Sequence, residues 1–186
     1  IYWSRNTADS LYADATDFFR SSEIVVTEEI ADGVYMLGGG PANSYMVEFK
    51  DWVAVFEAPI NERRSLAVIE EVVKLAPNKP IRWLINSHIH FDVIGGLRTY
   101  LHIGSTIVTQ RKNIAMLNRD VLNYRTEYID PDITSMWPPT ELAEGYNYEA
   151  INENFVITDN ERILRVYYVQ PLDHVQGMLM AYLPEE

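Results

Sequence analysis

Two histidines and an aspartate stand at alternate positions near the middle of the chain: His88, His90 and Asp92. In an extended backbone, alternate side chains point to the same face, so we expect these three to converge while the apolar residues between them face a core. Neutral imidazole binds zinc and similar divalent ions, and a carboxylate can bind a neighbouring ion or orient a ligand. The spacing therefore indicates half of a metal site.

A bare His-x-His is also typical of two surface histidines at the end of a strand. Three further features favour the metal site: Asp92, the pair Gly95-Gly96 that follows, and a distant histidine, His174, in a polar loop before the last apolar run. Taken alone, His174 is typical of a surface residue. We expect His102, the remaining histidine, to be a packing or surface residue.

The composition limits the kinds of ligand that the protein can bind. Its 186 residues, 47% apolar, can bury a substantial core in one domain. The formal net charge of −12 without a Lys/Arg block argues against nucleic acid and against an anionic membrane surface. No cysteine is present, so any metal must be held by histidine and carboxylate. No apolar run is long enough to span a membrane, and no signal-peptide pattern opens the chain, so we expect a soluble protein whose compartment is left open.

Hydrophobic periodicity places the motif in an α/β layer. Alternating runs within residues 24–56 predict an antiparallel meander, with Asp32-Gly33 as a hairpin turn. Apolar residues at helical spacing follow between residues 66 and 75, and the almost wholly apolar run 81–85 predicts a buried strand. The histidine motif then comes at the carboxyl end of that strand, where open α/β sheets usually carry their sites.

The remaining elements are predicted in the same way. A short amphipathic helix is expected over residues 8–20, and further helices over 97–101 and 111–128. Strands are expected over residues 105–109, 155–158, 162–169 and 178–183, whereas 130–147 has no regular pattern.

The sequence His88-x-His90-x-Asp92, followed by Gly95-Gly96-Leu97, resembles the HxHxDH signature of the metallo-β-lactamase-fold hydrolases. The likeness extends from about residue 24 to residue 183. The resemblance implies an α/β fold, the αββα sandwich of that family, C-terminally incomplete here. It divides the chain into a lead-in helix over residues 1–23 and a metallo-β-lactamase-like domain over 24–186, which would hold the first half of the sandwich and the start of the second.

The resemblance also implies a set of metal ligands. The family carries a metal histidine in the loop before a strand, followed by a glycine, and His174-Val175-Gln176-Gly177 is similar to that element. His88, His90 and His174 would then hold one zinc ion, with Asp92 near it. Two zinc ions are less expected, because Val93 stands where the family has its next histidine, and an isopropyl group cannot coordinate a cation.

Two classes of function follow. In the first, the chain is a zinc-dependent hydrolase that attacks an ester, lactam or related bond of a small molecule, and Asp92 is catalytic because it orients the water nucleophile or accepts its proton. In the second, the chain is a degenerate or truncated relative that serves as a non-catalytic binding or structural module. Val93 and Ile94 favour the module, and the three histidines with Asp92 favour the enzyme. An incomplete sheet would expose an edge, so we also expect either a homo-oligomer or a C-terminal segment beyond Glu186 to cover that edge.

Overall fold

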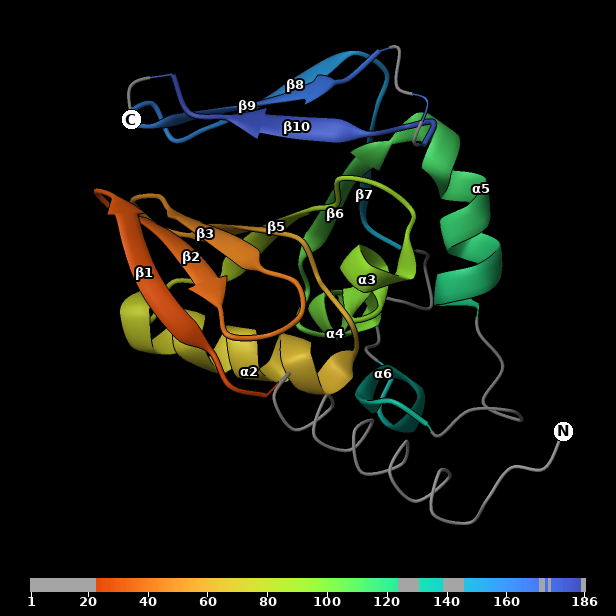
Figure 1. Ribbon diagram of the computed structural model, residues 1–186, viewed down its shortest axis with the longest axis horizontal. Helices are drawn as coiled ribbons and strands as arrows, with labels where there is room; N and C mark the ends of the chain where they lie inside the picture. The colour runs from red at the N-terminus through yellow and green to blue at the C-terminus, as the bar shows by residue number, and fades with distance from the viewer. Residues whose placement is uncertain (1–22, 124–130, 139–145, 171–172, 174, 185–186) are drawn as a thin grey trace, which may run out of the picture.

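A seven-stranded mixed sheet lies at the centre of the protein in the computed structural model, which describes residues 23–123, 131–138, 146–170, 173 and 175–184 (Figure 1). Its strands follow one another in sequence order, from β1 to β7. The lead-in helix expected within residues 1–23 lies, up to residue 22, outside the described residues.

The first four strands form the predicted antiparallel meander, and the last three are added in parallel. Gly33 has a φ of +65°, as its place in the turn between the first two strands requires. The seventh strand was not predicted; its four residues directly follow the stretch 130–147, which has no regular pattern. The strands are β1 (Val26–Ala31), β2 (Val34–Gly38), β3 (Ser44–Glu48), β4 (Val53–Phe56), β5 (Ile81–Ile85), β6 (Thr106–Gln110) and β7 (Tyr148–Ile151).

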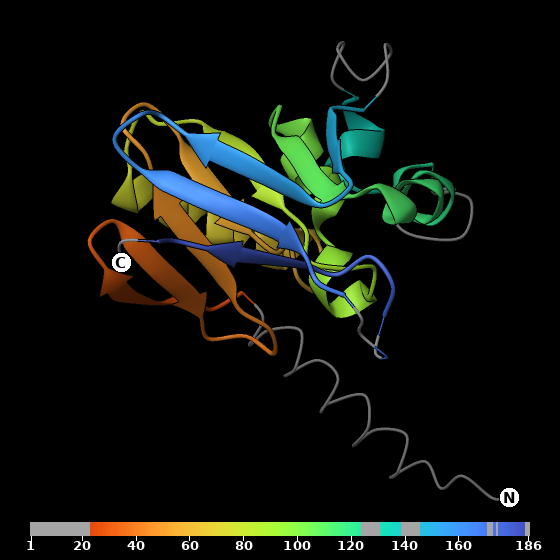
Figure 2. The ribbon, with the colours of Figure 1, turned by 90° about the horizontal axis from the view of Figure 1, so that it is seen from above.

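A second, antiparallel sheet of three strands packs against one face of the first, as Figure 2 shows from above. It has the order β10-β9-β8, so the outer edge of β10 pairs with no described strand. Leu164, Val166 and Leu179 from this sheet pack on Val47, Val108 and other inner residues of the large sheet. These strands are β8 (Asn154–Thr158), β9 (Ile163–Tyr168) and β10 (Leu179–Tyr182), close to the predicted runs.

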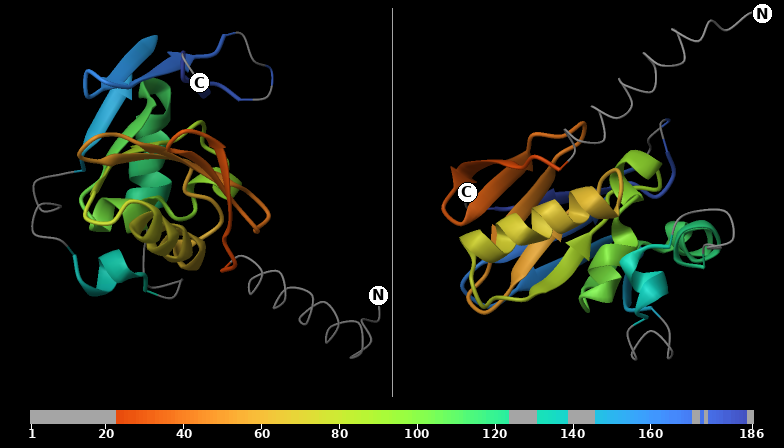
Figure 3. Two further views of the ribbon diagram at one scale, coloured as in Figure 1. Left: turned by 90° about the vertical axis from the view of Figure 1, so that its left-hand side faces the viewer. Right: turned by 90° about the horizontal axis from the view of Figure 1, so that it is seen from below.

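Helices cover the opposite face of the large sheet, where Figure 3 shows α2 lying along it. Helix α2 begins after Asn61, whose side-chain oxygen accepts a hydrogen bond from the Arg64 amide, and it buries Val68 and Val72 in a second core. The predicted helix over 111–128 is helical without a break from Arg111 to Leu122, as a 3-10, an α and a π segment in turn. The helical segments are α2 (Glu62–Leu75), α3 (Phe91–Ile94), α4 (Leu97–His102), η1 (Arg111–Asn113), α5 (Ile114–Met116), η2 (Leu117–Leu122) and α6 (Ile133–Met136).

The described residues therefore form a helical layer, the large sheet and the small sheet, which are three of the layers of an αββα sandwich. No helix among them covers the outer face of the small sheet (Figure 1). Within the same residues, none of the helices combines the length and the apolar character needed to cross a lipid bilayer.

Candidate metal centre

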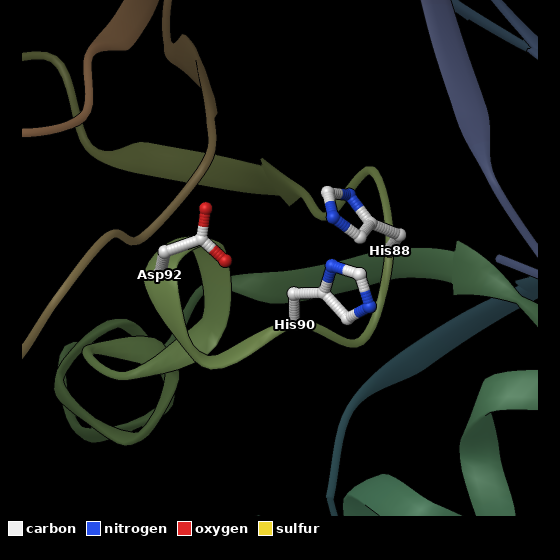
Figure 4. Close-up of side chains that lie close together, drawn as sticks. All are labelled: His88, His90 and Asp92. Carbon is white, nitrogen blue, oxygen red and sulfur yellow. The ribbon is translucent and has the colours of Figure 1, made fainter. Parts of the chain in front are cut away.

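The three residues of the histidine motif meet at the carboxyl end of β5, but not through an extended backbone. The strand ends at Ile85, His88 and His90 lie on the loop that follows, and Asp92 lies in the first turn of α3. The alternation argument was therefore wrong about the backbone. One ligand atom from each residue still lies within 4.8 Å of the others, and Figure 4 shows the Asp92 carboxylate turned towards the two rings.

The glycine pair after the motif lets the chain pack closely against the start of α2. A Cβ on Gly95 would lie 2.1 Å from the Ile60 carbonyl oxygen, and one on Gly96 would lie 1.8 Å from Oγ of Ser65. The Gly96 amide also donates to the Ala58 carbonyl oxygen at 2.9 Å. Only residues without a side chain allow this approach, so the glycines dock the motif against the start of α2.

Ser87 holds the first histidine of the motif. Its Oγ lies 2.7 Å from Nδ1 of His88. With a proton on Nδ1 donated to that oxygen, the Nε2 lone pair of His88 is left to face a metal. Ser87 was not among the predicted site residues, although a polar residue directly before a histidine, shortly after a buried strand, was a usable signal.

The two imidazole rings lie close together and at a steep angle. Their centroids are 4.7 Å apart and their planes meet at 74°. His88 is half-buried, whereas His90 and Asp92 are exposed. The exposed pair can rotate towards a cation without disturbing a packed core.

Glu57 lies behind this cluster, at the end of β4. Its side chain is 6% exposed, and its Oε2 accepts a hydrogen bond from the Ser87 amide at 3.4 Å. The pKa of the Glu57 carboxyl is raised to about 8, chiefly by burial, with a smaller raising effect of the Asp92 charge and a lowering effect of the hydrogen bonds from Ser87 and Asn86. Near neutral pH, the site therefore contains an acid that is mostly protonated.

The loop that carries Glu57 is strained. Glu57 and Ile60 both have positive φ angles, 72° and 67°, which side chains other than glycine rarely adopt. Such strain persists only where the surrounding packing over-determines the backbone, and it is often found at functional sites.

The two residues that depart from the family motif belong to the core. Val93 is half-buried against the core between the helices and the large sheet, and Ile94 is buried within it. The Val93 amide donates to the His90 carbonyl oxygen at 3.1 Å, and its own carbonyl oxygen accepts from the Ala58 amide at 3.2 Å. Apolar packing has taken the place where the motif has a polar ligand.

His174, the third histidine of the expected set, lies outside the described residues. The chain that follows it is anchored beside the motif, because the Leu179 amide donates to the Ser87 carbonyl oxygen at 2.7 Å. The Gly177 carbonyl oxygen accepts from the side-chain amide of Asn113 at 2.9 Å. These two bonds fix residues 177–179 to the loop after β5 and to η1.

The donor set is chemically suited to zinc. Two imidazole nitrogens and a carboxylate oxygen are typical zinc ligands, and the sequence has no thiolate to compete. Around a tetrahedral ion with bonds of about 2.1 Å, ligand atoms lie about 3.4 Å apart. From the limit of 4.8 Å, the atoms of His88, His90 and Asp92 need to approach one another by at most about 1.4 Å, a movement within reach of side-chain rotation.

The chain was compared with known protein families and curated proteins. A family model described as the metallo-beta-lactamase superfamily matches residues 37–164. A linear primary-alkylsulfatase from a Pseudomonas species is 32% identical to the chain over 71 residues. That segment is 38% of this chain and only 10% of the alkylsulfatase.

Solved structures share the fold at low sequence identity. A metallo-beta-lactamase from Pontibacter korlensis is 14% identical, with a TM-score of 0.63, over 87% of this chain and 67% of its own. A metallo-beta-lactamase from Pseudomonas aeruginosa, in a mono-zinc form, is 19% identical, with a TM-score of 0.60, over 87% of this chain and 65% of its own. A class B3 enzyme described as having an active-site glutamic acid reaches a TM-score of 0.64 at 14% identity, over 90% of this chain and 60% of its own.

Proposed function

The chain belongs to the metallo-β-lactamase superfamily, whose model matches more than half of it, and on that premise we propose that it is a hydrolase with a single zinc site. His88, His90 and His174 would hold the ion, with Asp92 beside it. The observation that carries this proposal is the convergence of His88, His90 and Asp92 at the end of β5. A set of three histidines leaves a fourth position for the reaction.

A bound zinc ion supplies Lewis acidity and lowers the pKa of water to near 7, so that a nucleophile is available at neutral pH. The chain's own residues supply orientation and proton transfer. Asp92 is exposed and turned towards the histidine rings, which supports its proposed role as acceptor of a proton from the attacking water. Ser87, through its contact with Nδ1, keeps the His88 ring in one orientation.

The substrate class that we propose is a small molecule with an ester, lactam or related bond. The segment of 71 residues shared with a linear primary-alkylsulfatase supports including a linear alkyl sulfate among the compounds tested. The shared fold supports including a lactam. These substrates differ in the leaving group but all need an activated water and a proton acceptor.

The proposal is tested by metal analysis and hydrolysis together. The purified chain, reconstituted with zinc and desalted, should carry about one equivalent of metal and hydrolyse at least one of a chromogenic ester, a lactam and a linear alkyl sulfate. Alanine at His88, His90 or His174 should lower zinc content and rate together, whereas alanine at His102, the histidine outside the proposed ligand set, should leave both unchanged. Absence of bound zinc after reconstitution would remove the enzyme proposal.

A second function, a non-catalytic binding or structural module, is favoured by one observation. Val93 and Ile94 have been absorbed into the apolar core, so the second metal position of the family motif is not available. The two functions are distinguished by activity: about one equivalent of zinc with metal-dependent hydrolysis excludes the module, and bound zinc without hydrolysis of any of the three substrates supports it.

A further inference from the structure

Three buried polar side chains lie next to one another at the carboxyl edge of the large sheet. They are Asn86, which directly follows β5, Thr109 of β6 and Asn113 of η1. Their exposed fractions are 1%, 0% and 2%, respectively. The hydrolytic step proposed above uses none of these three residues, which together make up what we call the polar ladder.

Hydrogen bonds join the members of the polar ladder to one another and to main chain at both ends. Nδ2 of Asn113 donates to Oγ1 of Thr109 at 3.3 Å, and that hydroxyl donates to Oδ1 of Asn86 at 3.4 Å. At one end, Nδ2 of Asn86 donates to the His88 carbonyl oxygen at 2.8 Å. At the other end, Nδ2 of Asn113 donates to the Gly177 carbonyl oxygen at 2.9 Å. The polar ladder therefore connects the loop of the histidine motif with the segment just before β10.

The Gly177 end of the polar ladder is closely fitted. Gly177 has a φ of +81°, and a Cβ at this position would lie 2.3 Å from Oδ1 of Asn113. The Asn113 amide thus packs directly on the glycine whose carbonyl oxygen it holds. Slightly later in the chain, the Leu179 amide donates to the Ser87 carbonyl oxygen at 2.7 Å. The segment is therefore tied to the motif loop twice, once directly and once through the polar ladder.

Net stability does not by itself account for polar side chains at these buried positions. Replacing hydrogen-bonded partners by apolar groups of the same shape can be nearly neutral or even stabilising. A buried polar network whose members satisfy one another is instead suited to making one arrangement rigid. The two segments held by the polar ladder are the ones that need a fixed arrangement if they bind one ion together.

We propose that Asn86, Thr109 and Asn113 position the metal centre, because they hold the His88 loop and residues 177–179 in one arrangement. The proposal rests on the proposed function, in which His174, just before this segment in the sequence, binds the same ion as His88. Loss of a residue that orients a metal ligand typically lowers metal affinity about 10- to 100-fold. Cutting the polar ladder should therefore weaken zinc binding, although none of its members is a proposed ligand.

The binding test cuts the polar ladder in its middle and uses a matched control. Thr109→Val keeps the shape of the side chain without the hydroxyl, and Thr109→Ser keeps the hydroxyl and should restore what the valine variant loses. Thr134 is 5% exposed, and its Oγ1 donates to the Arg98 carbonyl oxygen at 3.0 Å, so Thr134→Val loses a buried hydroxyl bond outside the polar ladder. In competition with a chromophoric chelator, Thr109→Val should bind zinc at least about tenfold more weakly than the wild type, whereas Thr134→Val should bind it equally well.

Cobalt bound in place of zinc reports the geometry of the site rather than the stability of the fold. The visible absorption bands of Co²⁺ in the full chain should shift in Thr109→Val and in Asn113→Ala but not in Thr134→Val. If the polar ladder acts as one unit, combining Thr109→Val with Asn113→Ala should lower zinc affinity no further than Asn113→Ala alone. Losses that multiply in the double variant would overturn the proposal, and so would equal zinc affinities and cobalt spectra in Thr109→Val and Thr134→Val.

Hydrogen exchange in the metal-free protein separates this proposal from the proposed function. The Leu179 amide should exchange at least about tenfold faster in Thr109→Val than in Thr134→Val, because the polar ladder then no longer holds its segment to the motif loop. That result in a protein that binds no zinc removes the proposed function and supports the polar ladder as the tie between the two segments. Zinc-dependent hydrolysis, with equal exchange and equal zinc affinity in the two variants, leaves the function in place and overturns the positioning role.

Discussion

Replacing the buried Glu57 with glutamine should stabilise the metal-free protein in alkaline solution and have little effect in mild acid. The carboxyl has an ordinary pKa of 4.5 and a pKa of about 8 in the folded protein, chiefly because burial penalises its charged form. Between these two values, the folded state holds a proton that the unfolded state has released. The free energy of unfolding therefore falls as the pH rises from about 4.5 to about 8.

The size of the effect follows from the two pKa values. They differ by about 3.5, and each unit corresponds to about 1.4 kcal/mol, so the full penalty at Glu57 approaches about 5 kcal/mol above pH 8. At pH 5, the pH is about half a unit above the unfolded pKa, and the penalty is below about 1 kcal/mol. Glutamine has the same shape and no charge, so its advantage over glutamate should grow by roughly 3–4 kcal/mol between pH 5 and pH 8.5.

Urea unfolding followed by circular dichroism, at pH 5 and at pH 8.5 in the presence of a chelator, measures this difference. The chelator is needed because a nearby cation would lower the pKa of Glu57. Glu57→Asp is the control, since it keeps an ionisable group at the same position and should keep the loss of stability with rising pH. A glutamine variant whose advantage over the wild type is equal at both pH values would refute the reasoning.

Three further predictions concern the motif and its support. Ser87→Ala removes the partner of Nδ1 of His88, so the affinity for zinc, measured in competition with a chromophoric chelator, should fall about 10- to 100-fold. Ser87→Thr keeps a hydroxyl and should recover the affinity. An alanine variant that binds zinc as tightly as the wild type would show that the hydroxyl does not orient the ring. Gly96→Ala brings a methyl group within 1.8 Å of Oγ of Ser65, so the free energy of unfolding in urea should fall by about 1–3 kcal/mol, and adding Ser65→Gly should restore part of it. Val93→His supplies an imidazole beside Asp92, and calorimetry should then detect a second, weaker zinc-binding event that the wild type lacks.

The fold could be predicted from the sequence where one period dominates a run of residues. The alternation or continuity of apolar residues located β4 and β5, and helical spacing located α2, all close to their observed bounds. Short-range patterns succeed for these elements because the apolar residues within each one already record which of its faces are buried. β7 escaped prediction, since its place in the sheet comes from pairing with β6 and not from a pattern of its own.

The motif's residues could be identified from the sequence, but their backbone could not. The alternation rule holds only inside a strand, and the strand ends at Ile85, three residues before His88. Gly95 and Gly96 then dock the chain against residues more than 30 positions earlier, a contact that no local pattern records. The resemblance to known metal motifs identified the site without depending on that backbone.

The packing of the two sheets holds the segment that follows the third proposed ligand in the sequence. The Leu179 amide is bonded to the Ser87 carbonyl oxygen, and Leu179 also belongs to the core between the sheets. The segment after His174 is therefore held at the motif by a strand-to-loop bond and by apolar burial together. A mutation that loosens the inter-sheet core, such as Val166→Ala, should weaken zinc binding through this connection, although Val166 has no atom that can bind a metal.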